Sequence, residues 1–93
     1  MNKLRLAILF GLQQFGREKT FSVILQDAGI RHSKAQLLEA ANELETLGLI
    51  ESITYQYPVE ITAELTSYGN ELLKSQQQEA FRSEHFHPKR ERL

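Results

Sequence analysis

The sequence predicts a small α+β domain that is mostly helical, with a three-helix core, a short β-hairpin and a C-terminal helix. Apolar residues recur at helical spacing in the first half of the chain. Between residues 51 and 65 apolar and polar residues alternate, which is typical of a hairpin with one buried face. Ninety-three residues support one domain. We expect it to span residues 1–82, with a flexible polar tail at residues 83–93.

The first helix is predicted over Lys3–Phe15, where a run of apolar residues has helical spacing. These residues are Leu4, Ile8, Leu12 and Phe15. Gly16 suits the C-cap of this helix, because a helix commonly ends on a glycine. A polar turn follows, from Arg17 to Lys19.

The next segment is expected to hold a short strand and a short helix. Thr20 and Phe21 are predicted to form the strand. Ser22 is a good N-cap for a helix from Val23 to Ala28, which Gly29 would end.

The third helix is predicted over Lys34–Leu47. Ser33 and Gln36 match a capping box, in which each side chain bonds the backbone N–H of the other residue. The predicted core stripe is Leu37, Ala41, Leu44 and Gly48. Leu38, at the border of that stripe, is expected to pack under the second helix.

The hairpin is predicted from its alternation. Its buried face is expected to hold Ile53, Tyr55, Tyr57, Val59, Ile61, Ala63 and Leu65. Pro58 suits the turn, where its missing N–H removes no ladder bond. Thr66 or Ser67 would then cap a closing helix that runs on toward Phe81.

Composition excludes several classes of site. The chain has no cysteine, so it has no disulfide, thiolate metal site or Cys nucleophile. No Gly-rich phosphate loop or catalytic constellation is present, so we expect neither an enzyme nor a cofactor. His85 and His87 lack a third ligand nearby, so no metal site is expected. No apolar run is long enough to span a bilayer, and the chain is expected to be cytoplasmic.

The net charge of −1 is unevenly distributed. Residues 1–33 carry five positive and two negative side chains, whereas residues 34–79 carry two positive and eight negative ones. Residues 80–93 carry four positive and two negative side chains. The cations of this last segment are equally compatible with a phosphate-binding arm and with a solubilising tail.

Two motifs carry a resemblance to a known family. Leu44-Glu45-Thr46-Leu47-Gly48-Leu49-Ile50 ends a helix and starts a strand, and Leu65-Thr66-Ser67-Tyr68-Gly69-Asn70-Glu71-Leu72-Leu73 ends a strand and starts a helix. With the element order, they make residues 4–75 resemble winged helix-turn-helix transcriptional regulators, in the broad PadR-like and MarR-like group. The resemblance implies double-stranded DNA as the partner and the third helix, residues 33–47, as the recognition helix.

The resemblance also implies the residues that would contact DNA. At the start of the third helix these are Arg31, His32, Ser33, Lys34 and Gln36, with Glu39, Asn42 and Glu43 further along. Arg17 and Lys19 are expected near phosphates. The chain departs from the family in its carboxylates, because the hairpin has no Lys or Arg and a carboxylate repels phosphate. The alternative is a protein-interaction module that uses the acidic face of Glu39, Glu43 and Glu45.

Regulators of this group usually pair through their terminal helices, so a homodimer is expected. The side chains expected at its interface are Leu9, Phe10, Leu73 and Phe81, which look like more apolar surface than one small monomer hides.

Overall fold

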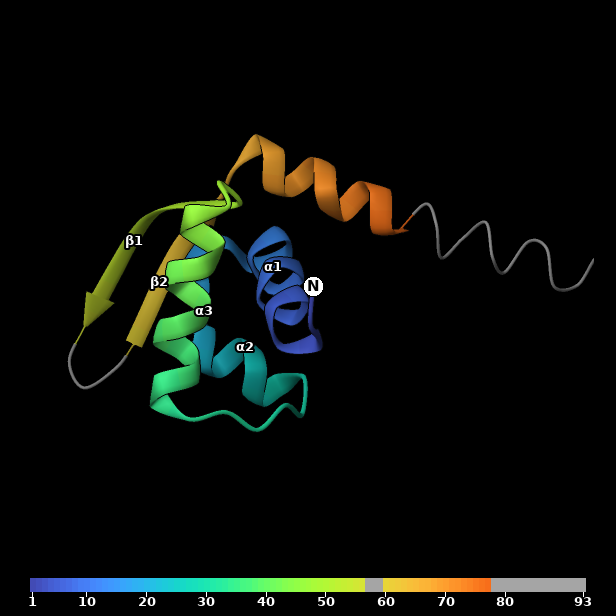
Figure 1. The fold of residues 1–93 in the computed structure, drawn as a ribbon. Coiled ribbons are helices and arrows are strands. Elements are labelled where there is room, and N and C mark those ends of the chain that lie inside the picture. The colour runs from blue at the N-terminus through green and yellow to red at the C-terminus, as the bar shows by residue number, and fades with distance from the viewer. Residues whose placement is uncertain (57–59, 78–93) are drawn as a thin grey trace, which may run out of the picture.

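The computed structural model describes residues 1–56 and 60–77. In chain order it contains α1 (Lys3–Phe15), the 3₁₀ helix η1 (Gly16–Glu18), α2 (Phe21–Asp27), α3 (Lys34–Thr46), β1 (Ile50–Gln56) and β2 (Glu60–Leu65). A C-terminal helix follows at residues 67–77. The described chain is therefore α+β and mostly helical, and its strands form one antiparallel hairpin (Figure 1).

The bounds of α1 confirm the prediction. The Asn2 side chain caps its start by accepting from the Arg5 N–H at 2.9 Å, and Gly16 is its C-cap. Ile8, Leu9 and Leu12 are buried on one side of this helix. Leu9 was expected at a dimer interface, and that prediction is wrong because its side chain has no exposed surface within the single chain.

The prediction for Thr20 and Phe21 is also wrong, because these residues start α2 and form no strand. The Thr20 hydroxyl, rather than that of Ser22, accepts from the Val23 N–H at 3.3 Å and caps the helix. Phe21 is the first helical residue, and its side chain is fully buried. The aromatic side chain thus fills the core from a helix, which a local β-propensity does not reveal.

The predicted capping box of α3 is present. The Ser33 hydroxyl accepts from the Gln36 N–H at 3.1 Å, and the Gln36 side chain accepts from the Ser33 N–H at 2.8 Å. The helix buries Leu37, Ala40, Ala41 and Leu44. Gly48 lies outside this stripe and is exposed, contrary to the prediction, but its φ of +75° confirms the left-handed conformation expected there.

The hairpin contains a bulge that the sequence pattern does not reveal. Tyr55 pairs with Ile61 and Thr54 with Thr62, but the register shifts between Glu51 and Thr54. Ser52 lies in this shifted stretch with a φ of +54°. Ile61 and Ala63 are buried as predicted. Tyr57, Pro58 and Val59 lie outside the described residues.

Tyr55 does not join the core, contrary to the prediction. It lies on the same face of the hairpin as the buried Ile61, but its side chain is 54% exposed. Tyr55 lies near the end of β1, in the part of the hairpin that extends away from the helices (Figure 1).

The C-terminal helix starts beside the junction of α3 and β1. The Thr66 hydroxyl donates to the Gly48 carbonyl at 2.6 Å and accepts from the Gly69 N–H at 2.9 Å, which confirms Thr66 as its cap. Leu73 is fully buried, so the prediction that it lies at a dimer interface is wrong. Phe10 is half-buried against the core, and Phe81 lies outside the described residues, as does the predicted tail.

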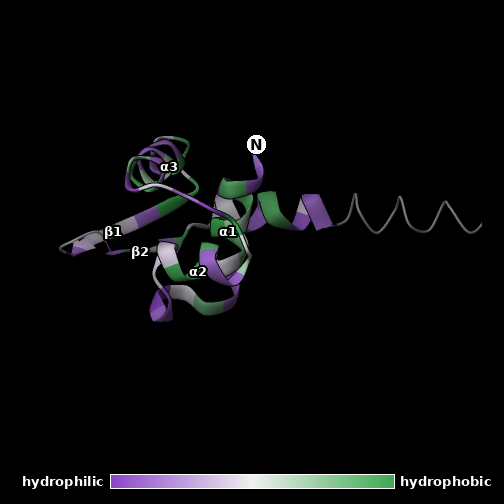
Figure 2. Ribbon diagram, turned by 90° about the horizontal axis from the view of Figure 1, so that it is seen from below, coloured by the Kyte–Doolittle hydropathy of each residue, from purple (hydrophilic) through white to green (hydrophobic). Residues whose placement is uncertain are grey.

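These elements leave one helix at the edge of the molecule. In Figure 2, α3 lies apart from α1 and α2, with the hairpin extending to one side. Its long axis runs along the hairpin, and β1 returns beside it in the opposite direction (Figure 1). No described element covers the outer side of α3, and this exposed surface is the candidate site.

Candidate nucleic-acid interface

The turn before α3 is held by His32. Its ring Nδ1 lies 3.1 Å from the Ile30 carbonyl oxygen and its Nε2 lies 3.4 Å from the Ser22 hydroxyl. The side chain is half-buried between α2 and the turn. His32 therefore orients α3 against α2, and it does not point outward as a base contact would require.

Ser33 and Gln36 also have a structural role. The bonded oxygen of each side chain is engaged by the backbone N–H of the other residue. Arg31 and Lys34 are exposed, and neither forms an ion pair with another described residue. Of the five residues expected to contact DNA at the start of α3, these two cations present their charge to solvent.

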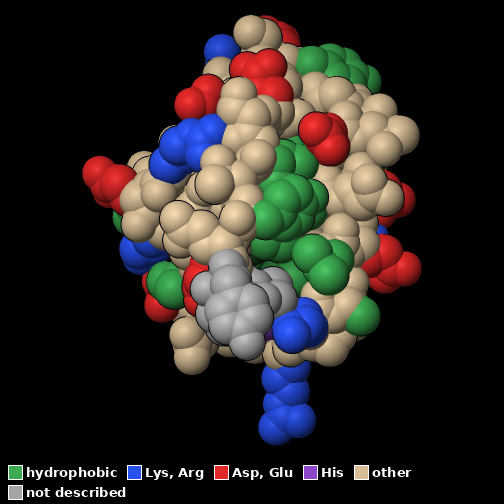
Figure 3. Space-filling view, turned by 90° about the vertical axis from the view of Figure 1, so that its left-hand side faces the viewer, with side chains coloured by type: hydrophobic (Ala, Val, Ile, Leu, Met, Phe, Trp, Pro, Cys, Tyr) green, Lys and Arg blue, Asp and Glu red, His purple; other side chains and the backbone are tan. Residues whose placement is uncertain are grey.

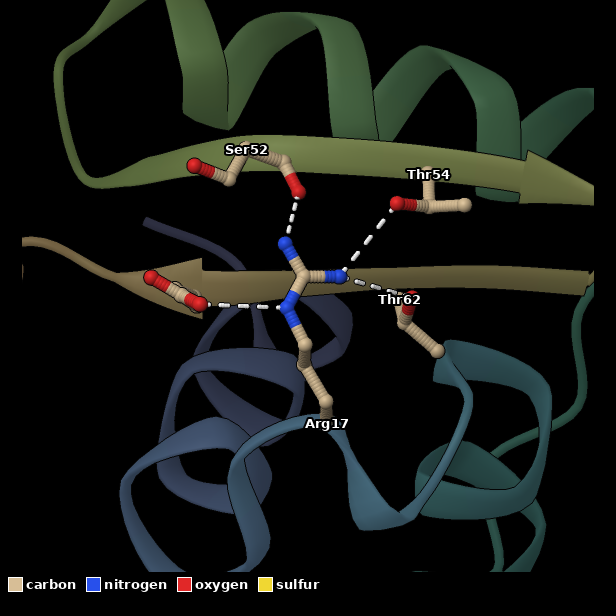
Figure 4. A network of polar contacts seen from close by, with 5 residues as sticks. Arg17, Ser52, Thr54 and Thr62 are labelled. Carbon is tan, nitrogen blue, oxygen red and sulfur yellow. Dashed lines mark hydrogen bonds and ion pairs between the residues drawn. The ribbon is translucent and has the colours of Figure 1, made fainter.

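Arg17 does not present its charge to solvent in the same way, because its guanidinium binds the hairpin (Figure 4). Its Nε donates to the Glu64 carboxylate at 3.1 Å, its Nη1 donates to the Thr54 and Thr62 hydroxyls at 3.3 and 3.1 Å, and its Nη2 donates to the Ser52 carbonyl. Four of the roughly five guanidinium donors are thus used inside the chain. The expectation that Arg17 contacts phosphate is not supported by this geometry.

Lys19 is engaged in a similar way. Its Nζ lies 2.9 Å from an Asp27 carboxylate oxygen and 3.9 Å from the centroid of the Phe15 ring. These contacts join the segment after α1 to the end of α2. Lys19 therefore serves the packing of the two helices, and its charge is partly neutralised by Asp27.

The Arg17 contacts yield a stability prediction. We expect Arg17→Ala to destabilise the domain by about 1–2 kcal/mol, because the substitution leaves the bulged Ser52 carbonyl and Glu64 without their charged donor. Arg17→Lys is expected to recover little, because a single ammonium cannot reproduce the planar fork. Urea denaturation followed by circular dichroism would measure both variants. A matched Arg31→Ala control should leave stability unchanged, and equal effects of the two alanine variants would contradict the role assigned to Arg17.

The outer face of α3 carries fewer carboxylates than the sequence indicates. Glu43, which was expected on the DNA-facing side, forms an ion pair with Arg5 of α1. It therefore lies on the flank of α3 that faces α1. On a helix whose buried side is Leu37, Ala40, Ala41 and Leu44, the residues that point outward are Ala35, Glu39, Asn42 and Thr46. All four are exposed, and Glu39 is the single carboxylate among them.

The other flank of α3 faces the hairpin and carries the apolar Leu38 between Lys34 and Glu45. Leu38, which was expected to pack under α2, is 42% exposed on this flank, so that prediction is wrong. Ile53, half-buried, and the exposed Tyr55 lie on the hairpin face that α3 adjoins. Leu38, Ile53 and Tyr55 are called the apolar strip below. Figure 3 shows hydrophobic side chains gathered on this side of the molecule, with charged side chains around them.

The sequence alone did not identify Ala35 and Leu38 as site residues. A helical projection centred on the residues that prove to be buried would have placed both at the surface, but Ala40 was missing from the predicted core stripe. Asn42 was among the residues implied by the resemblance, and its exposure agrees with that implication.

Comparison of the chain with protein-family models, with curated proteins and with solved structures finds no match. Within residues 1–56 and 60–77, no helix has the length and apolar character needed to cross a membrane. The same part of the chain holds no group of three or more His, Cys, Asp or Glu side chains placed to bind a metal ion.

Proposed function

We propose that this chain is a winged-helix protein that binds double-stranded DNA, with α3 as its recognition helix. The observation that carries the proposal is the outer face of α3, which no described element covers and which presents Asn42 and Ala35 at an edge of the domain. A helix of this kind fits the major groove, where base edges offer a distinct pattern for each base pair.

The placement of charges on this face of the folded chain supports the proposal more than the count of charges along the sequence does. Arg31 and Lys34 lie at the start of α3, where the N-terminal residues of a recognition helix meet DNA. Glu43 is turned toward Arg5, which reduces the number of carboxylates facing phosphates. On this proposal the hairpin is a wing held in place by Arg17.

Lys34→Glu tests the proposal. It is expected to weaken binding to all duplexes about equally and to lower the slope of log affinity against log salt by about 1, because Lys34 would contact a phosphate. Fluorescence anisotropy with labelled genomic duplexes, at low and at physiological salt, would measure this. Lys74→Glu makes the same charge change on the C-terminal helix, which lies far from the start of α3, and serves as the control (Figure 1). If the unaltered protein formed no sequence-preferring complex in either salt condition, that result would contradict the proposal.

A protein-interaction module remains a second candidate because Glu39 and Glu45 are both exposed on α3. Of the three glutamates expected to form the acidic face, Glu43 forms an ion pair with Arg5 of the same chain. A stoichiometric complex with one basic protein, weakened by Glu45→Arg and formed without nucleic acid, would favour this candidate over DNA binding. The predicted homodimer would have to use side chains other than Leu9 and Leu73, because both are buried.

A further inference from the structure

We infer that α3 recognises DNA through thymine methyl groups and an adjacent adenine, so that its preferred sites are rich in A·T pairs. This inference rests on the proposed function and names the bases that the helix would read. It starts from four exposed residues, Ala35, Leu38, Glu39 and Asn42. They follow the spacing i, i+3, i+4 and i+7, so they form one continuous patch on the helix.

Two of the four side chains in this patch, Ala35 and Leu38, are apolar and exposed. Leu38 keeps 42% of its surface exposed, and the methyl group of Ala35 lies one turn before it. The apolar strip continues from Leu38 across to Tyr55 of the hairpin, where another 54% of a large side chain is exposed. The surface that would meet the major groove therefore includes exposed apolar side chains as well as polar ones.

The major groove offers one apolar group, the C5-methyl of thymine. Ala35 and Leu38 match it because each presents methyl groups and neither has a donor or acceptor. The side-chain amide of Asn42 matches the N6 and N7 atoms of adenine, and the Glu39 carboxylate can accept from the N6 amino group of adenine. Each of the four side chains thus has a partner within A·T pairs.

Charge complementarity identifies the occupant as DNA. Arg31 and Lys34 lie at the start of the same helix and are exposed, so they can meet phosphates that border the groove. Arg17 and Lys19 are engaged within the chain, so the phosphate contribution from the described residues is small. Sequence preference must then come largely from contacts of the patch with bases.

The experiment begins with selection from a random duplex library and identification of the preferred site. Each thymine of that site is then replaced by deoxyuridine, which removes the C5-methyl group and leaves the pairing unchanged. The expected loss is about fourfold in affinity for each methyl group that the patch buries, since it removes roughly one carbon from an apolar contact. Anisotropy titration of the two duplexes measures the loss.

Variants then assign the methyl contact to a residue. Leu38→Ala should bind more weakly and should become insensitive to deoxyuridine at one position, whereas Leu47→Ala should keep the full sensitivity. Leu47 is a suitable control because it is 50% exposed at the far end of α3, away from the patch. Asn42→Ala should lose the preference for adenine at one position. Circular dichroism of each variant would confirm that the helix is intact.

The outcomes separate the inference from the function on which it rests. Equal affinity for the thymine and deoxyuridine duplexes would overturn the inference and leave DNA binding standing. Selection of a site rich in G·C pairs would also overturn the inference and leave DNA binding standing. Failure to select any duplex would overturn the proposed function and the inference together. Loss of a protein complex on Leu38→Ala, without any bound duplex, would assign the patch to protein docking and would also overturn both.

Discussion

Phe21→Ala is expected to destabilise the domain by about 3–5 kcal/mol, a large part of the stability of a protein this small. Phe21 is fully buried at the start of α2, in a core shared with α1 and α3. Its removal would leave a cavity that surrounding helices cannot fill without moving. Thermal and urea denaturation followed by circular dichroism would measure the loss.

Val23→Ala is the matched control for this prediction. Val23 lies in the same helix but is 37% exposed, so its truncation should change stability by much less, about 0.5 kcal/mol. If the two variants were equally stable, Phe21 would not fill the core in the way the structure shows.

Gly69→Ala is expected to destabilise the domain by about 1–3 kcal/mol, although alanine is the better helix former. Gly69 lies in the first turn of the C-terminal helix and is buried against the junction of α3 and β1. An added Cβ would overlap the Leu49 backbone carbonyl and would lie 2.9 Å from Cδ1 of Leu65. Backbone cannot move aside as a flexible side chain does, so the helix would shift away.

Such a shift would also break the cap of that helix. Thr66 bonds both the Gly48 carbonyl and the Gly69 N–H, and its own N–H donates to the Leu49 carbonyl at 3.0 Å. Gln76→Ala, at an exposed position of the same helix, is the control and should be neutral or slightly stabilising. A Gly69→Ala variant that melted at or above the temperature of the unaltered protein would show that the close approach to Leu49 is absent in solution.

Local signals determined much of the fold. The capping box of α3 was predictable because Ser33 and Gln36 bond groups three residues away, and the bounds of α1 followed from apolar spacing and Gly16. The Thr66 cap and the alternation of Ile61 and Ala63 were predictable for the same reason. Each of these features depends on interactions within a few residues of chain.

The candidate site was less predictable because its residues depend on distant partners. Arg17 and Ser52 are 35 residues apart, and no local sequence pattern indicates that the guanidinium would bind the polar face of a bulged hairpin. Glu43 was expected to face outward, but it pairs with Arg5 of α1, which lies 38 positions earlier in the chain. Charge counts along the chain therefore overstated both the cations and the carboxylates available to a partner.

The amino-acid sequence by itself determined the bounds of α1, the caps that start α3 and the C-terminal helix, and the alternation of Ile61 and Ala63, because capping and periodicity are local. The tertiary structure alone decided which charges remain at the surface and which apolar side chains stay exposed. Leu38 and Leu44 are both leucines of α3, yet Leu44 is buried and Leu38 is not. The difference arises because burial depends on what other elements supply at each point around a helix, and α1, α2 and the hairpin leave one side of α3 uncovered.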